Sequence, residues 1–81
     1  MQSESVLGTR IFEQRKKLGL SQAQLGAKIG LSHKAISTLE SGTRGTSLDK
    51  LIELAYVFRV STDYLLGLTD DPTWRGEEEP E

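Results

Sequence analysis

Two short segments with helical hydrophobic spacing follow one another between residues 21 and 42, and only Gly30 and Leu31 lie between them. Ser21 and Ser32 occupy positions where helix N-caps are expected, and Gly42 follows the second segment as a stop. Because the link is so short, the two helices must pack on each other. The rest of the chain then has to supply the core that both helices need.

This pair of helices has two interpretations. A tight turn containing glycine is typical of a DNA-binding helix-turn-helix, whereas an ordinary αα-hairpin gives the same spacing. Gly26 favours the first interpretation. A glycine inside a helix costs roughly 1 kcal/mol against alanine, and close approach of the third helix at this position would explain its presence.

Hydrophobic spacing and end signals predict three further helices. They cover about residues 5–18, a segment that starts near residue 47, and a segment from about residue 61 to a stop at Gly67. The fourth helix is expected to bury a set of apolar side chains in the core: Leu48, Leu51, Ile52 and Ala55. The sequence shows no clear strand pattern and no internal repeat. The expected fold class is therefore all-α, a compact domain of five helices.

Charge divides the chain near residue 70. Residues 1–69 hold nine Lys or Arg and six Asp or Glu, a net charge of +3, whereas residues 70–81 carry a net charge of −5. The first part suits approach to a polyanion, and the second part would be repelled by one. Pro72, Pro80 and a run of glutamates favour a flexible segment. The expected organisation is a domain over residues 1–69 and an acidic, flexible tail over residues 70–81.

Several function classes are disfavoured by what the sequence lacks. It has no cysteine, so no disulfide or thiolate metal site is expected, and its apolar runs are too short for a membrane span. The N-terminus has no features of a secretory signal, which favours a cytoplasmic location without a membrane partner. A single histidine, no phosphate-binding glycine loop and glutamates clustered in the tail argue against an enzyme. No metal and no cofactor are expected.

The third helix has an outward face made of hydrogen-bonding side chains. Leu31, Ile36 and Leu39 recur at helical spacing and face the core. The side chains that then point outward are His33, Lys34, Ser37, Thr38 and Ser41. A solvated helix face is the ordinary explanation for such residues. Contact with the base edges of DNA is the alternative, since these groups can donate to or accept from bases.

Two stretches, LGLSQAQLGAKIGLSHKAISTLESG and SLDKLIELAYVFRVSTDYLLG, resemble the Cro/repressor-type helix-turn-helix family, also called the XRE family. The match spans about residues 7–68 and includes the spacing of Gln22, Leu25, Gly30, Ile36, Glu40 and Gly42. It departs from the family pattern at Gly26, Ser41 and Thr46, where alanine, asparagine and proline are common. The resemblance implies a phage-repressor-like fold and sequence-specific binding of double-stranded DNA by a transcriptional repressor or other regulator.

The resemblance also implies roles for individual residues. In this family the third helix enters the major groove, which implies base contacts by Ser32, His33, Lys34, Ser37 and Thr38. The implied phosphate contacts are Gln22, Ser41, Thr43 and Arg44, although the departure at Ser41 weakens its assignment. The family often pairs an arginine with a glutamate at the positions of Arg15 and Glu40, which implies a structural ion pair. The alternative is two independent surface charges.

One helix-turn-helix reads only a few base pairs, so a homodimer on a near-palindromic operator is expected. The candidate dimer interface consists of apolar residues near the C-terminal end of the fold: Phe58, Tyr64, Leu66, Leu68 and Trp74. Alternatively, the fifth helix and the tail cover this surface within one chain. The alternative function is an antitoxin or adaptor that binds a protein partner through the acidic tail, with Trp74 as the anchor.

Overall fold

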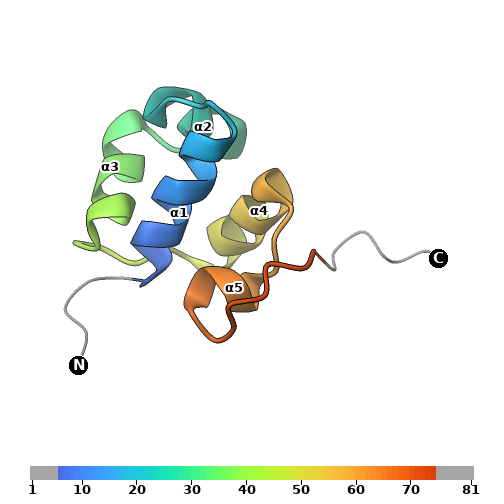
Figure 1. Cartoon of the computed structure of the whole chain (residues 1–81). Helices are drawn as coiled ribbons and strands as arrows, with labels where there is room; N and C mark the ends of the chain where they lie inside the picture. Colours follow the sequence, from blue (N-terminus) through green and yellow to red (C-terminus); the bar gives the residue numbers. More distant parts are fainter. Residues whose placement is uncertain (1–5, 75–81) are drawn as a thin grey trace.

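The computed structural model describes residues 6–74, and these residues form five α-helices and no strand. The helices are α1 (Val6–Lys17), α2 (Gln22–Ile29), α3 (His33–Ser41), α4 (Leu48–Phe58) and α5 (Thr62–Leu66). In Figure 1, α1 lies at the centre, with α3 on one side and α4 on the other. α2 packs against α3 and α4, while α5 packs against α1 and α4. The predicted all-α, five-helix fold class is confirmed.

Serine side chains begin four of these helices. Each accepts a hydrogen bond from the backbone N–H three residues later, and the four are Ser21, Ser32, Ser47 and Ser61. Gln24 accepts in turn from the backbone N–H of Ser21, which confirms the predicted capping box. α2, α3 and α5 end at glycines with left-handed backbone. The predicted start of the first helix at residue 5 lies outside the described residues.

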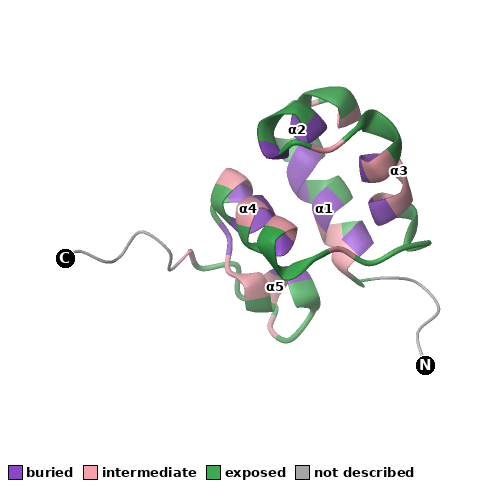
Figure 2. Ribbon diagram, turned by 180° about the vertical axis from the view of Figure 1, so that it is seen from behind, coloured by how far each residue is buried: buried purple, intermediate pink, exposed green. Residues whose placement is uncertain are grey.

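A single apolar core lies between the helices, visible in Figure 2 as purple on the sides that face one another. α4 buries a face that differs in part from the predicted one, since Leu51 and Ala55 are buried as predicted and the other two residues are not. Its buried residues are Leu51, Leu54, Ala55 and Phe58, whereas Leu48 and Ile52 are 75% and 47% exposed. The prediction that Leu48 and Ile52 belong to the core is wrong, because α4 turns its other apolar side toward α1, α2 and α5.

Two helices approach neighbouring backbone closely at glycines. A Cβ on Gly26 of α2 would lie 2.3 Å from the carbonyl oxygen of Leu31, and a Cβ on Gly8 of α1 would lie 2.5 Å from that of Leu39. Both distances are too short for a side chain without a backbone shift. The close approach predicted at Gly26 is present. It involves the turn before α3 and the cap residue Ser32, and the helix itself begins only after them.

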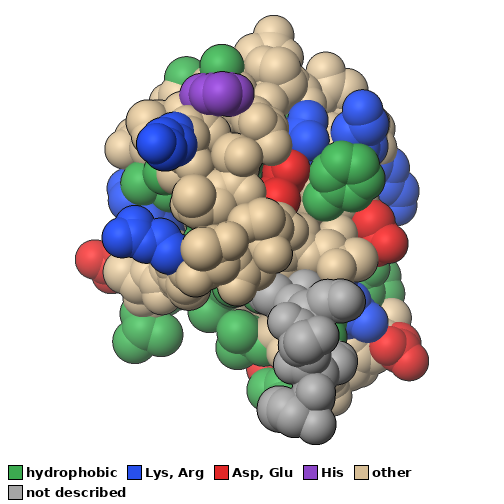
Figure 3. Space-filling model, turned by 90° about the vertical axis from the view of Figure 1, so that its left-hand side faces the viewer, with side chains coloured by type: hydrophobic (Ala, Val, Ile, Leu, Met, Phe, Trp, Pro, Cys, Tyr) green, Lys and Arg blue, Asp and Glu red, His purple; other side chains and the backbone are tan. Residues whose placement is uncertain are grey.

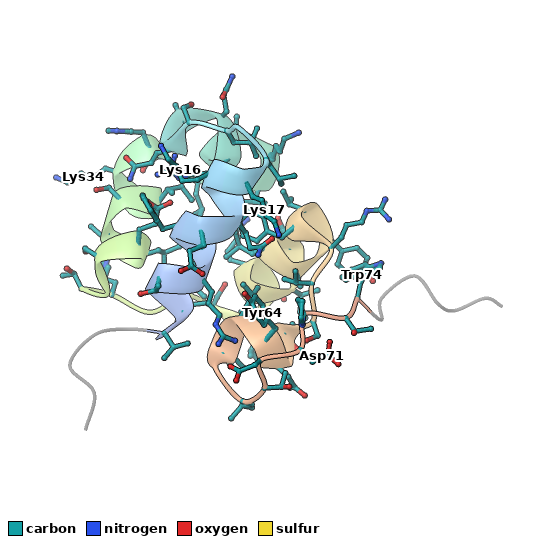
Figure 4. The ribbon with its side chains drawn as sticks, viewed as in Figure 1. Lys16, Lys17, Lys34, Tyr64, Asp71 and Trp74 are labelled. Atoms are coloured by element: carbon teal, nitrogen blue, oxygen red, sulfur yellow. The ribbon has the colours of Figure 1, made fainter. Side chains whose placement is uncertain are left out.

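Residues 69–74, here called the C-terminal segment, return to the domain after α5. The backbone N–H of Ser61 donates to the carbonyl of Pro72 at 3.3 Å. Trp74 is half-buried against the core, and its ring meets Tyr56 edge to face with the centroids 4.8 Å apart (Figure 4). Pro72 and Trp74 of the predicted flexible tail therefore contact the domain, while residues 70–73 are exposed. Residues 75–81, which carry four of the tail's six acids, lie outside the described residues.

Arg10 of α1 joins the end of α5 to the C-terminal segment. Its guanidinium donates to the carbonyls of Tyr64 and Thr69 at 2.6 and 2.7 Å, and to the Asp70 carboxylate at 2.9 Å. It also lies 4.1 Å above the centre of the Tyr64 ring. Nothing in the sequence indicated this role, because the partners of Arg10 are more than 50 residues away along the chain.

Candidate nucleic-acid interface

α3 presents its polar side to the surface while its apolar side is fixed in the core. Ile36 and Leu39 are buried, His33 and Lys34 are exposed, and Ser37 and Thr38 are half-buried. Lys34 points away from the body of the domain in Figure 4. Figure 3 faces this side of the molecule and shows Lys and Arg side chains and the histidine around a broad area of backbone and uncharged side chains, with a few acidic side chains among them.

The five predicted base-contacting residues differ in whether their side chains already make hydrogen bonds within the protein. The Ser32 hydroxyl accepts the cap bond from Ala35, and the Thr38 hydroxyl donates to the Ala35 carbonyl at 2.9 Å. His33, Lys34 and Ser37 make no side-chain hydrogen bond to any other described residue. Among the five, these three are therefore the side chains with no hydrogen bond to another described residue, while Ser32 and Thr38 keep part of their hydroxyl capacity.

The C-terminal end of α3 brings together the predicted phosphate contacts that follow the helix. The Ser41 hydroxyl bonds the Thr38 carbonyl at 3.0 Å and the Thr43 hydroxyl at 2.8 Å. Gly42 takes the left-handed conformation, with φ of 80°, which turns the chain out of the helix. Arg44 then stands exposed in the loop before α4. This end of α3 thus places two hydroxyls and one cation next to each other in sequence on one exposed turn.

The N-terminal end of α2 lies beside an open hollow lined by residues from α1, α2 and α3. Lining residues include Lys16, Gln22 and His33. Gln22 begins α2, and its side-chain amide donates to the Glu40 carboxylate at 3.0 Å. The free backbone N–H groups at a helix N-terminus favour an anion. The hollow therefore combines hydrogen-bond donors with a lysine, next to His33 on the polar side of α3.

Arg15 and Glu40 form the ion pair that the resemblance implies. The guanidinium donates to both carboxylate oxygens, at 2.6 and 3.0 Å, and to the Leu20 carbonyl at 2.9 Å. Both side chains are about nine-tenths buried, at 9% and 8% exposed. The hydrogen bond to Glu40 raises the pKa of Arg15 above its ordinary value. Because its pKa is raised, Arg15 stays protonated in the folded protein at any pH below its unfolded pKa, so deprotonation of Arg15 does not weaken the pair there.

A contact made by Lys50 was also missed by sequence reasoning. Lys50 of α4 donates from Nζ to the Ile29 carbonyl at 2.5 Å, at the C-terminal end of α2. A cation there satisfies a carbonyl that the helix leaves unpaired. The usual sequence signal is a basic residue in the helix's own last turn. Lys50 belongs to another helix 21 residues later, so only the tertiary structure identifies it.

A family model described as Helix-turn-helix matches residues 11–65. The chain belongs to the helix-turn-helix family. Its match covers all of α2, α3 and α4 and most of α1 and α5. This membership confirms the predicted resemblance and decides between the two interpretations of the helix pair in favour of the helix-turn-helix.

Relatives of this helix-turn-helix chain are named as transcriptional regulators. YobD of Bacillus subtilis, an uncharacterised HTH-type transcriptional regulator, is 43% identical over 63 residues, 78% of this chain and 56% of YobD. An uncharacterised HTH-type regulator of Archaeoglobus fulgidus is 35% identical over 66 residues, 82% of this chain and 94% of that protein. The chain spans about half the length of YobD and of ImmR, another Bacillus subtilis regulator.

A solved structure of the P22 c2 repressor in complex with a synthetic operator has a TM-score of 0.72 and 40% identity to this helix-turn-helix chain. The match covers 74% of this chain and 91% of that one. These relatives are named as transcriptional regulators or repressors, which agrees with the prediction of a regulator. Within residues 6–74 no helix is long and apolar enough to cross a membrane. The same residues contain no group of three or more His, Asp or Glu side chains placed to hold a metal.

Proposed function

We propose that the chain is a transcriptional regulator, acting in the cytoplasm, that binds double-stranded DNA in a sequence-specific manner with α3 in the major groove. The observation that carries this proposal is that α3 has a buried apolar side and an outward polar side with hydrogen-bonding groups available. Ile36 and Leu39 hold the helix in place, while the side chains of His33, Lys34 and Ser37 make no hydrogen bond to another residue within the described range 6–74. Lysine can donate to guanine, and the serine hydroxyl can donate or accept.

Phosphate contacts flank this reading face in the proposal. Gln22 and the N-terminus of α2 lie on one side of α3, and Ser41, Thr43 and Arg44 follow its end. Such contacts fix the position of the protein on the duplex without reading sequence. Arg44 is the strongest member of the set, because it is exposed and carries a permanent charge.

Replacing Lys34 by alanine is expected to relax the preference at one or two base positions, with a loss of about 1–3 kcal/mol on the best site. Arg44→Ala is the matched control, since it should weaken binding to all sequences alike and reduce the salt dependence by about one phosphate contact. The measurement is affinity for selected and random duplexes at several salt concentrations. Equal loss on both duplexes for both variants would contradict the division into base and phosphate contacts.

We further propose that two copies bind a near-palindromic operator, with their recognition helices about 34 Å apart. The structure changes the set of residues available for the dimer. Phe58 is only 5% exposed and belongs to the core, so its predicted place in the interface is wrong. Tyr64 lies under the Arg10 guanidinium, and Trp74 packs on Tyr56. Leu66 and Leu68, at 45% and 74% exposed, remain as the apolar side chains that a second copy would cover.

Leu68→Glu is expected to shift the protein to a folded monomer with weaker binding to a palindromic duplex, because a charge cannot be buried unpaired in the interface. Leu48→Glu is the matched control, since Leu48 is equally exposed, at 75%, but lies at the start of α4. Sedimentation equilibrium at micromolar concentration gives the result. A monomer before any substitution, or a dimer lost only with Leu48→Glu, would contradict an interface at Leu66 and Leu68.

The fold-back of Trp74 bears on the alternative function of an antitoxin or adaptor. In that function the tryptophan was expected to anchor the tail in a partner's pocket. Its packing on Tyr56 and the core instead supports the role of a cover within one chain. No described feature favours a protein partner over DNA.

A further inference from the structure

Three helices of the domain meet at a single carboxylate. Glu40 of α3 accepts from Arg15 of α1 through both oxygens, and its Oε1 also accepts from the Gln22 amide of α2 at 3.0 Å. We call this three-residue arrangement the carboxylate bridge. It links the buried ion pair of the core to the side chain at the start of the helix-turn-helix.

We propose that Glu40 is a positioning residue for DNA binding, and this inference rests on the proposed function. Its carboxylate holds the Gln22 amide before DNA arrives, and Arg15 cancels its charge. The Gln22 amide nitrogen has two N–H groups. One is directed to Glu40, so the second has a defined place from which to donate to a phosphate oxygen. A glutamine without this contact would have to be ordered on binding, which costs about two- to tenfold in affinity.

The charge of the bridge matters as much as its hydrogen bonds. A carboxylate bonded to a phosphate-contacting side chain would repel the phosphate if it stood alone. Arg15 is held against it in two-point contact, and the Phe12 ring lies over the guanidinium, 5.4 Å from its carbon to the ring centre. The burial of both side chains keeps the pair closed and neutral as a unit. The carboxylate that positions Gln22 therefore adds no net negative charge near the DNA, because Arg15 neutralises it.

Two double variants separate positioning from structural support. Arg15→Met/Glu40→Gln and Arg15→Met/Glu40→Leu both remove the ion pair, and their residues at position 40 have nearly the same size and no charge. They differ in one respect, since glutamine can still accept from the Gln22 amide and leucine cannot. We expect the variant with Glu40→Gln to bind duplex DNA about fivefold more tightly than the variant with Glu40→Leu, with the same salt dependence.

Adding Gln22→Ala to each double variant completes the test. In the variant with Glu40→Gln, Gln22→Ala should weaken DNA binding about five- to tenfold. In the variant with Glu40→Leu it should weaken binding less than about twofold, because leucine no longer positions Gln22. Affinities are compared well below the thermal midpoint of every variant, so loss of fold does not enter. Equal affinity of the two double variants, or an equal effect of Gln22→Ala in both, would overturn the positioning role.

A measurement on the unaltered protein in the absence of DNA keeps the bridge testable if a variant fails to fold. Gln24 is a control in the same helix, since its side chain accepts from Ser21 and its amide nitrogen donates to no other described residue. Proton exchange of side-chain amides by NMR should be at least about fivefold slower for Gln22 than for Gln24. Equal rates would overturn the bridge itself. If the Gln22 amide exchanges slowly but the protein binds no duplex DNA, the proposed function is overturned instead.

Discussion

Glu40→Ala is expected to destabilise the domain by about 3–5 kcal/mol, because it leaves the Arg15 guanidinium buried without its partner. The cost follows from burial, since the Arg15 side chain is only 9% exposed and its remaining hydrogen bond is to the Leu20 carbonyl. For a domain of this size, the thermal midpoint should fall by at least about 12 °C. Thermal and denaturant unfolding followed by circular dichroism measures the change.

Glu53→Ala is the matched control for this loss. Glu53 forms an ion pair with Lys50 at 3.6 Å, but the two side chains are 45% and 29% exposed. A pair so accessible to water contributes little, so the midpoint should hardly move. The double variant Arg15→Met/Glu40→Leu should be more stable than Glu40→Ala, since it removes both charges together. A Glu40→Ala protein within about 1 kcal/mol of the original would contradict the assignment of a buried pair.

Arg10→Ala is expected to destabilise the domain by about 2–4 kcal/mol. One guanidinium donates to the carbonyls of Tyr64 and Thr69 and stacks on the Tyr64 ring. Its loss leaves the Thr69 carbonyl without this donor and the Tyr64 carbonyl with only the Gly67 N–H at 3.1 Å. Hydrogen bonds to a charged group contribute about 1.5–3 kcal/mol each. The C-terminal segment should loosen with it. Trp74, the only tryptophan in the chain, then reports its release by fluorescence.

Asp70→Asn separates the carbonyl contacts of Arg10 from its ion pair. The Asp70 side chain is almost fully exposed, so the midpoint and the Trp74 emission should stay near those of the original protein. Arg10→Lys should give an intermediate midpoint, because an ammonium can still donate to the carbonyls but lacks the planar guanidinium that lies over the Tyr64 ring. An Arg10→Ala protein with unchanged stability and emission would show that the C-terminal segment is held by other contacts.

Helix boundaries were predictable here because their signals are local. Ser21 and Gln24 lie three residues apart and complete a capping box without help from the rest of the chain. The buried face of α4 was not predictable, since the helix has two apolar sides. One contains Leu48 and Ile52, and the other contains Leu54 and Phe58. Only packing against α1, α2 and α5 decides which side is buried, and spacing within one helix contains no information about those neighbours.

The candidate site divides in the same way. The outward set on α3 follows from the positions of Ile36 and Leu39 within a single helix, so the sequence predicted it. The contact from Gln22 to Glu40 joins residues 18 apart, and the contacts of Arg10 join residues more than 50 apart. Such partners are brought together by the fold as a whole. The family resemblance predicted the Arg15–Glu40 pair, but it gave no indication that Gln22 would share the same carboxylate.

The caps and stops of α3 have a consequence for how proteins of this kind can diverge. Ser32 and Gly42 set the ends of the helix, and Ile36 and Leu39 set its buried side. His33, Lys34 and Ser37 take part in neither task, so substitutions there leave the scaffold intact as long as the new residues tolerate a helix. Under the proposed function, a lineage that carries this domain can therefore acquire new target sequences by a few changes on one surface, without passing through unstable intermediates.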